Sequence, residues 1–265
     1  MPVFDNQIVL LAGLPRTGST LLTNILAQNP NFHVEGNSGL CQIMWDAKVS
    51  CEVSALEQLV ASGRKDKIQS NVIGNIVSSY YNEVEGKTII DKCRPWVSQP
   101  NIEMARNYIS HDVKAIVMLR PVDEIVASYA RVHFANGGDE GIYDWLLADD
   151  NHVLMNSYYS VMYAIESGAK NHLFLTYDEL TSQTQKFTRR FYDFIGQDYF
   201  VHNIRNIKQV VTENDEDNNM VGMHTIRPKL CQVKNKVQLP SRIKEKCDIL
   251  TDALFGTLSS FREAI

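Results

Sequence analysis

The sequence predicts an α/β protein of three layers, in which a central, mostly parallel sheet carries helices on both faces. Short apolar runs rich in Ile, Val and Leu alternate along the chain with longer stretches of helical periodicity. The apolar runs are continuous, as expected of strands that are covered on both faces. The chain has 265 residues, of which 44% are hydrophobic, and this suffices for one large α/β domain.

The elements follow in chain order. The expected strands are QIVLLA (7–12), KTIID (87–91), KAIVML (114–119) and HLFLT (172–176). The expected helices cover 18–28, 66–84, 122–134, 178–196 and 241–264.

Local signals mark several helix ends and one loop. The helix at 122–134 begins just after Pro121, with two acidic residues in its first turn, and the helix at 178–196 ends at Gly196. The polar, acidic stretch 212–222 reads as a surface loop. We therefore expect a single domain over residues 1–265, with this loop as an excursion over the sheet.

Composition excludes several classes of protein. The net charge of −5 argues against a long nucleic-acid groove, and no run approaches the ~18 apolar residues of a membrane span. The first residues have no basic region of the kind that opens a signal peptide. The five cysteines are scattered without metal-ligand spacing, so we expect reduced thiols, no metal site and a cytoplasmic protein.

A glycine-containing loop joins the first strand to the first helix in the stretch AGLPRTGSTLLTNIL. Gly13 and Gly18 have the spacing of the phosphate-binding loop G-x-x-x-x-G-K-[ST], but Ser19 stands in place of its lysine and Arg16 lies inside it. Backbone N–H groups at a helix start are unpaired, and the helix dipole favours negative charge. With the hydroxyl of Thr20 and the guanidinium, the loop predicts an anion site.

The absent lysine indicates what kind of anion binds. An NTPase loop uses that lysine on the outer phosphates and its Ser/Thr on Mg²⁺. A ligand with less charge beyond its first phosphate, such as a phosphosulfate, fits better and requires no metal. A second basic position, Arg120, follows the strand at 114–119, with Ser128 two helical turns later, and this pair can hold a second phosphate.

Three stretches resemble the sulfotransferases that use 3′-phosphoadenosine 5′-phosphosulfate (PAPS), with the tyrosylprotein sulfotransferases as the nearest subgroup. GLPRTGSTLLTNILAQNP resembles the family's 5′-phosphosulfate loop, and VMLRPVDEIVASYAR resembles its 3′-phosphate segment. HLFLTYDELTSQTQKFTRRFYDFIG is similar to a later strand and helix of the family. The resemblance covers about residues 7–36, 87–134 and 170–196, and it implies a sulfotransferase architecture like that of the P-loop NTPases.

The resemblance also implies roles for individual residues. It places the 5′-phosphosulfate on Arg16, Thr17, Gly18, Ser19 and Thr20, and the 3′-phosphate on Arg120 and Ser128. Tyr177 would lie near the nucleotide, and Arg227 and Lys229 would belong to a late basic loop that closes over it. The product would be 3′,5′-adenosine bisphosphate.

The catalytic residues follow from the same resemblance. Arg16 would stabilise the transition state, and Lys92, after the strand at 87–91, matches an active-site lysine of the subgroup. The general base would be Glu35, although ungapped counting from Arg16 puts Asn37 at the family's glutamate position. His33 is the second candidate for the base.

Two other functions remain open from the sequence. One is a P-loop nucleotide kinase or NTPase, in which Asp91 after KTII would bind Mg²⁺. The other is a nucleotide-binding scaffold without catalysis. The acceptor of a sulfotransferase would be a hydroxyl group on a small molecule, a glycan or a peptide tyrosine. Its identity and the oligomeric state do not follow from the sequence.

Overall fold

The computed structural model describes residues 6–216, 220–231 and 237–264, and its centre is one five-stranded sheet. The strands lie in the order β2-β3-β1-β4-β5, and every neighbouring pair is parallel. Their bounds are β1 Ile8–Gly13, β2 Phe32–Val34, β3 Thr88–Lys92, β4 Lys114–Leu119 and β5 His172–Thr176. The predicted α/β class and the four predicted strands are confirmed. The prediction missed β2, which has only three residues.

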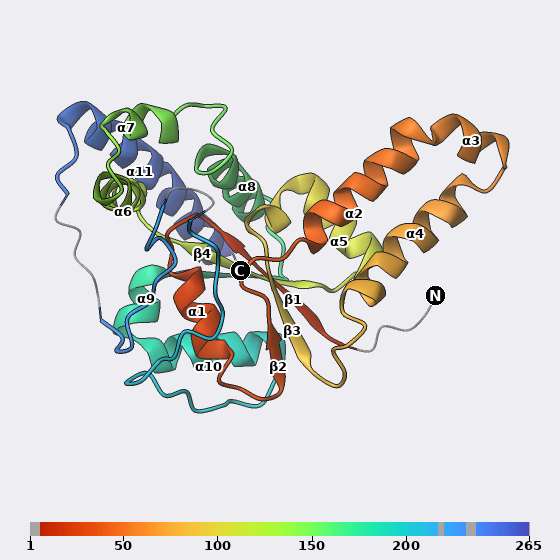
Figure 1. Cartoon of the computed structure of the whole chain (residues 1–265), viewed down its shortest axis with the longest axis horizontal. Helices are drawn as coiled ribbons and strands as arrows, with labels where there is room; N and C mark the ends of the chain where they lie inside the picture. The colour runs from red at the N-terminus through yellow and green to blue at the C-terminus, as the bar shows by residue number, and fades with distance from the viewer. Residues whose placement is uncertain (1–5, 217–219, 232–236, 265) are drawn as a thin grey trace.

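Helices cover both faces of the sheet because side chains alternate along each strand. On β1, Val9 and Leu11 face one apolar cluster, and Leu10 and Ala12 face the other. Figure 1 shows the two outer layers. The first holds α1 (Ser19–Leu26), α9 (Tyr177–Ser182) and α10 (Thr184–Ile195), and the second holds α5 (Gln99–Tyr108), α6 (Val122–Ala135), α8 (Met155–Glu166) and α11 (Ser241–Ala264).

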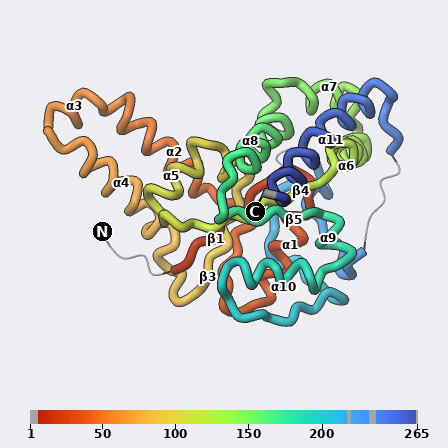
Figure 2. The backbone as a smooth tube through the Cα atoms, turned by 180° about the vertical axis from the view of Figure 1, so that it is seen from behind, coloured from red at the N-terminus to blue at the C-terminus, as the bar shows by residue number. Residues whose placement is uncertain are grey.

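A helical arm extends from the body on the side of β2 and β3, as both views show (Figures 1 and 2). It consists of α2 (Leu40–Val49), a π-helical turn η1 (Ser50–Ser54), α3 (Leu56–Ala61) and α4 (Lys65–Tyr80). The helix predicted at 66–84 is α4, and it ends four residues early at Tyr80. The 3-10 helix η2 (Arg94–Val97) and α7 (Gly141–Leu146) complete the described helices.

The long helix predicted at 178–196 is divided in two. Thr176 caps α9, with its hydroxyl accepting from the backbone of Glu179 while the Glu179 carboxylate binds back to Thr176. The chain leaves helical geometry at Gln183 and resumes as α10. Gly196 ends α10 in the left-handed conformation with φ 76°, as its glycine predicts.

The carboxyl ends of all five strands lie at one edge of the sheet, and this edge collects the predicted site. At that edge β1 ends at Gly13, where φ is 124° and an added Cβ would lie 2.2 Å from the carbonyl oxygen of Met118. Only glycine fits this close approach of two strands. Lys92 is the last residue of β3, whereas the prediction ended this strand at Asp91 and placed Lys92 just after it.

Among the described residues, no helix combines the length and the apolar character needed to cross a bilayer.

Candidate active site

The loop between β1 and α1 has the geometry of an anion cradle. Gly18 precedes α1 with φ 80°, and an added Cβ there would lie 2.8 Å from the ring of Tyr177. Among the described residues no side chain caps α1, so its first amides are available to a ligand. Arg16 adopts φ 58°, a left-handed conformation uncommon for a side-chain-bearing residue. Strain of this kind gathers at functional sites.

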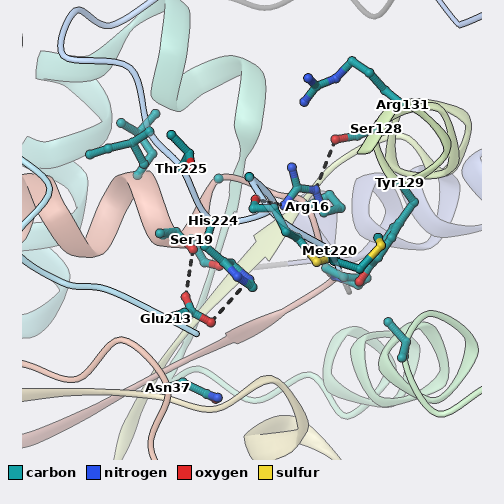
Figure 3. Close-up of a pocket in the computed structure, with 18 of the residues that line it drawn as sticks. Arg16, Ser19, Asn37, Ser128, Tyr129, Arg131, Glu213, Met220, His224 and Thr225 are labelled. Atoms are coloured by element: carbon teal, nitrogen blue, oxygen red, sulfur yellow. Dashed lines mark hydrogen bonds and ion pairs between the residues drawn. The ribbon is translucent and has the colours of Figure 1, made fainter. Parts of the chain in front are cut away.

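The Arg16 side chain is drawn into the cavity by neighbours from two other segments (Figure 3). Its Nε donates to Ser128 Oγ at 3.2 Å, and a terminal nitrogen donates to the carbonyl of Met223. The guanidinium lies 6.0 Å from the centre of the Tyr129 ring. Burial lowers the pKa of Arg16, with the nearby cation Arg131 adding to the effect. A cation without a carboxylate partner in these contacts suits an incoming anion.

Arg120 is buried, with only 5% of its surface exposed. Its Nε donates to Glu124 at 2.9 Å, and another nitrogen donates to the carbonyl oxygen of Arg16 at 2.9 Å. The guanidinium also lies over the Tyr177 ring at 4.0 Å. Arg120 therefore holds the strained loop residue in place while it lines the cavity.

Lys92 brings a second cation to the start of α1. Its side chain is 8% exposed, and its Nζ lies 2.5 Å from Oε1 of Glu213 and 3.2 Å from Oγ1 of Thr20. The Thr20 hydroxyl donates to the same Glu213 oxygen at 3.0 Å. Burial lowers the pKa of Lys92, while the Glu213 carboxylate acts in the opposite direction. One carboxylate oxygen is therefore held by both the hydroxyl and the ammonium group.

Glu213 also belongs to a network of charged side chains with His224 and Asp215. The second oxygen of Glu213 lies 3.3 Å from Nε2 of His224, and the other ring nitrogen lies 2.5 Å from Oδ1 of Asp215. The backbone N–H of His224 donates to Asp215 as well, at 2.9 Å. Burial raises the pKa of Asp215, but the hydrogen bonds from His224 outweigh it and leave that pKa below its usual value.

Glu35 follows β2 at the same edge of the sheet. Its backbone N–H donates to the carbonyl of Ile90, so it lies beside the end of β3. Its Oε1 lies 2.9 Å from Nε2 of His33, and the side chain is 30% exposed. Counting along the chain left open whether Glu35 or Asn37 matches the family's glutamate position. In the structure both residues line the same cavity.

The cavity around these groups has a volume of about 1450 Å³. Seven Lys and Arg residues and three Asp and Glu residues occur among the described residues that line it, although acidic residues outnumber basic ones, 31 to 26, in the chain. The excess of positive charge is therefore local and indicates an anionic ligand. The predicted site residues on its wall are Arg16, Gly18, Ser19, Thr20, Glu35, Lys92, Arg120, Ser128, Tyr177, Arg227 and Lys229.

Thr17 differs from the other predicted loop residues. Its side chain is fully buried, and its hydroxyl donates to the carbonyl oxygen of Leu14 at 2.8 Å. Thr17 is not among the described residues that line the cavity. Its hydroxyl therefore shapes the loop, and only its backbone N–H remains for a ligand.

Asp91 does not suit the magnesium-binding role of the kinase hypothesis. Its side chain is fully buried and accepts hydrogen bonds from Ser38 at 2.7 Å, Tyr81 at 2.5 Å and Trp96 at 2.6 Å. Burial raises its pKa, and these three donors oppose that rise. It is a core carboxylate that ties β3 to its surroundings.

The sequence-based prediction did not place Glu213 and His224 in the site, nor Arg94 and Arg131, all of which line the cavity. The acidic stretch was expected to be a surface loop, yet the Glu213 side chain is only 10% exposed. The sequence offered one signal for Glu213 and His224, which is charge. The acidic stretch 212–222 is followed closely by the basic residues Arg227 and Lys229, in a chain that was predicted to have a basic pocket. No local periodicity could reveal which carboxylate turns inward.

Comparisons with known proteins agree on the fold. The sulfotransferase domain of the Synechococcus PCC 7002 olefin synthase resembles this chain with a TM-score of 0.60 and 16% identity, over 96% of this chain and 97% of that one. A sulfotransferase from Alicyclobacillus acidocaldarius has a TM-score of 0.56 and 11% identity, over 97% of this chain and 98% of that one. Mouse sulfotransferase SULT7A1 complexed with PAP has a TM-score of 0.56 and 14% identity, over 97% of this chain and 86% of that one. A comparison with curated protein sequences gives no significant match.

The sequence itself carries the assignment to a family. A model of the sulfotransferase family matches residues 9–200, which include the loop, Lys92, Arg120, Ser128 and Tyr177. This match spans more than half of the chain. The chain therefore belongs to the sulfotransferase family, and it is an enzyme of sulfuryl transfer.

Proposed function

We propose that this sulfotransferase takes the sulfuryl group from PAPS and transfers it to a hydroxyl-bearing acceptor, without a metal ion. The observation that carries the proposal is that Lys92 reaches Thr20 in the uncapped first turn of α1 and that Arg16 lines the same cavity, in a loop that lacks the NTPase lysine. Arg16 and Lys92 would together replace that lysine at the 5′ anion of the donor. The presence of PAP in the mouse relative supports the same donor class.

The donor's two anionic ends match two parts of the cavity. The 5′-phosphosulfate would bind the backbone N–H groups of the loop and α1, from Thr17 to Thr20, together with the Arg16 guanidinium. The 3′-phosphate would bind Arg120 and the hydroxyl of Ser128. Tyr177, Arg227 and Lys229 would contact the nucleotide between and above these ends.

The donor, when bound, supplies the sulfuryl group and a phosphate leaving group. In our proposal Glu35 accepts the proton of the acceptor hydroxyl as its oxygen bonds to sulfur, while the bond from sulfur to the bridging oxygen breaks and its electron pair stays on the phosphate. Arg16 and Lys92 stabilise the negative charge on the sulfuryl and phosphate oxygens. His33 holds the Glu35 carboxylate through the 2.9 Å contact and so orients the base.

Thermal stability tests the donor class. Adding 3′,5′-adenosine bisphosphate in EDTA should raise Tm, because a ligand of the folded state stabilises it by mass action. Arg16→Ala should reduce the shift, whereas Arg64→Ala, on the arm before α4, should leave it unchanged. A larger shift with ATP that requires Mg²⁺ would contradict the proposal.

Transfer of labelled sulfuryl to a panel of phenols, alcohols, glycans and tyrosine peptides tests the base. Glu35→Gln should lower the rate by roughly 100-fold or more while the bisphosphate still binds. Glu57→Gln, an exposed carboxylate on the arm, is the matched control. Full activity of Glu35→Gln would remove Glu35 from the reaction.

A further inference from the structure

Arg16 and Lys92, the two cations proposed to bind the donor's 5′ anion, both contact oxygen atoms of one segment of the chain. Lys92 contacts Oε1 of Glu213 at 2.5 Å, and Arg16 donates to the backbone carbonyl of Met223. We call residues 212–216 and 220–226 the covering segment. Figure 3 shows Glu213 and His224 of this segment beside Arg16 in the cavity.

Glu213 stands where an incoming anion would be bound. The Thr20 hydroxyl and the Lys92 ammonium both direct hydrogen bonds to its Oε1, at 3.0 Å and 2.5 Å. Thr20 lies in the first turn of α1, whose amides have no side-chain cap. A carboxylate oxygen and a phosphate or sulfuryl oxygen accept from the same donors, so they compete for this place.

The covering segment also has contacts away from Lys92 and Thr20. The side-chain oxygen of the fully buried Asn24 accepts from the N–H groups of Val210 at 2.7 Å and Val211 at 2.8 Å. Within the segment, Asp215 and His224 bind each other through side chain and backbone. None of these contacts involves Glu213, so they can persist when Glu213 leaves Lys92 and Thr20.

We propose that Glu213 is a built-in competitor of the donor's 5′ anion, which leaves the Thr20 and Lys92 donors when the donor binds and returns to them as the desulfated product departs. This inference rests on the proposed function, since it assumes a donor with a 5′ anion at α1. The Glu213 carboxylate and a 5′-phosphate are both negatively charged and repel each other, so they cannot both accept from Thr20 and Lys92 at contact distance. The return of Glu213 weakens product binding, which is useful where product release limits turnover.

The test compares two ligands that differ only at the 5′ position. Calorimetry gives Kd for 3′,5′-adenosine bisphosphate and for adenosine 3′-monophosphate, with the wild-type chain and with Glu213→Gln. We expect Glu213→Gln to bind the bisphosphate roughly tenfold more tightly, with a slower dissociation rate, and to bind the 3′-monophosphate unchanged. Glu216→Gln removes the same charge from an exposed position of the segment and should change neither Kd.

Three outcomes would overturn the inference. These are an unchanged or weaker bisphosphate Kd in Glu213→Gln, an equal gain for both ligands, and an equal gain in Glu216→Gln. Failure of the wild-type chain to bind the bisphosphate would instead overturn the proposed function, and the inference with it.

A measurement on the wild-type chain covers the case in which Glu213→Gln does not fold. In a crystal structure with the bisphosphate, Lys92 should contact the 5′-phosphate and Glu213 should lie beyond hydrogen-bond distance of it. A Glu213 carboxylate still on Lys92, beside a bound 5′-phosphate, would overturn the inference.

Discussion

The loop between β1 and α1 (residues 13–20) and the covering segment meet at the same cavity, but different contacts hold them. Backbone contacts fix the loop: the N–H of Leu14 donates to the carbonyl of Met118 at 3.0 Å, and Arg120 holds the carbonyl of Arg16. Ion pairs and side-chain hydrogen bonds fix the covering segment, through Asn24, Lys92 and Asp215. The loop therefore behaves as part of the sheet, and the segment as a part that an anion can displace.

The largest effect should come from the loop. Gly13→Ala puts a Cβ 2.2 Å from the Met118 carbonyl at a φ of 124°, so we expect a loss of more than about 4 kcal/mol in the free energy of unfolding. Gly74→Ala, within α4 and with open space around it, should instead stabilise by about 0.5–1 kcal/mol. Urea unfolding measures both. Similar values for the two variants would show that the loop is not rigidly held.

The same contrast explains what the sequence could predict. Gly13, Gly18 and the flanking apolar and helical patterns are local, so the loop, the sheet edge and the helices next to it follow from the sequence. The place of Glu213 depends on Lys92, distant in the chain, and on charge compensation in a buried pocket. The short strand β2 has too few residues to show a period of its own. Such features are set by tertiary contacts, which single-sequence patterns do not encode.

The second effect tests the ion pair that holds the covering segment. Lys92→Met leaves the Glu213 carboxylate buried without its cation and should cost about 3 kcal/mol of stability. Lys48→Met removes a comparable pair at the surface of the arm, with Glu52, and should cost less than about 1 kcal/mol. Chemical unfolding compares the two. Equal losses would mean that the segment does not depend on Lys92.

The third effect concerns the base of the segment. Asn24→Ala leaves the N–H groups of Val210 and Val211 without their acceptor and should cost about 1–3 kcal/mol. Asn101→Ala, which removes one exposed hydrogen bond to the Pro95 carbonyl, is the control and should be nearly neutral. Limited proteolysis should cut the Asn24→Ala chain faster within 207–231. Unchanged cleavage would contradict the anchoring role of Asn24.

The smallest effect is a pH dependence confined to the segment. The pKa of Asp215 lies below its usual value in the folded chain, so its contribution to stability is present above about pH 4 and is lost as pH falls through the folded-state pKa. Hydrogen exchange in the covering segment, corrected for intrinsic rates, should therefore rise severalfold from pH 5 to pH 2. Asp215→Asn should remove this rise, and the loop should not show it. A matching rise in the loop would point to global acid unfolding.

Arg120 binds a backbone oxygen of Arg16 and covers the Tyr177 ring, while Tyr177 in turn packs on Gly18. Three residues that a binding study would treat as separate, Arg16, Arg120 and Tyr177, are therefore coupled by direct contacts. A loss of nucleotide affinity in Arg120→Ala would combine the loss of the proposed phosphate contact with a relaxed Arg16 backbone. Arg120→Lys, compared with a Tyr177→Phe and Tyr177→Leu pair, separates charge from shape, and mutational scans of this enzyme are best interpreted with those three positions taken together.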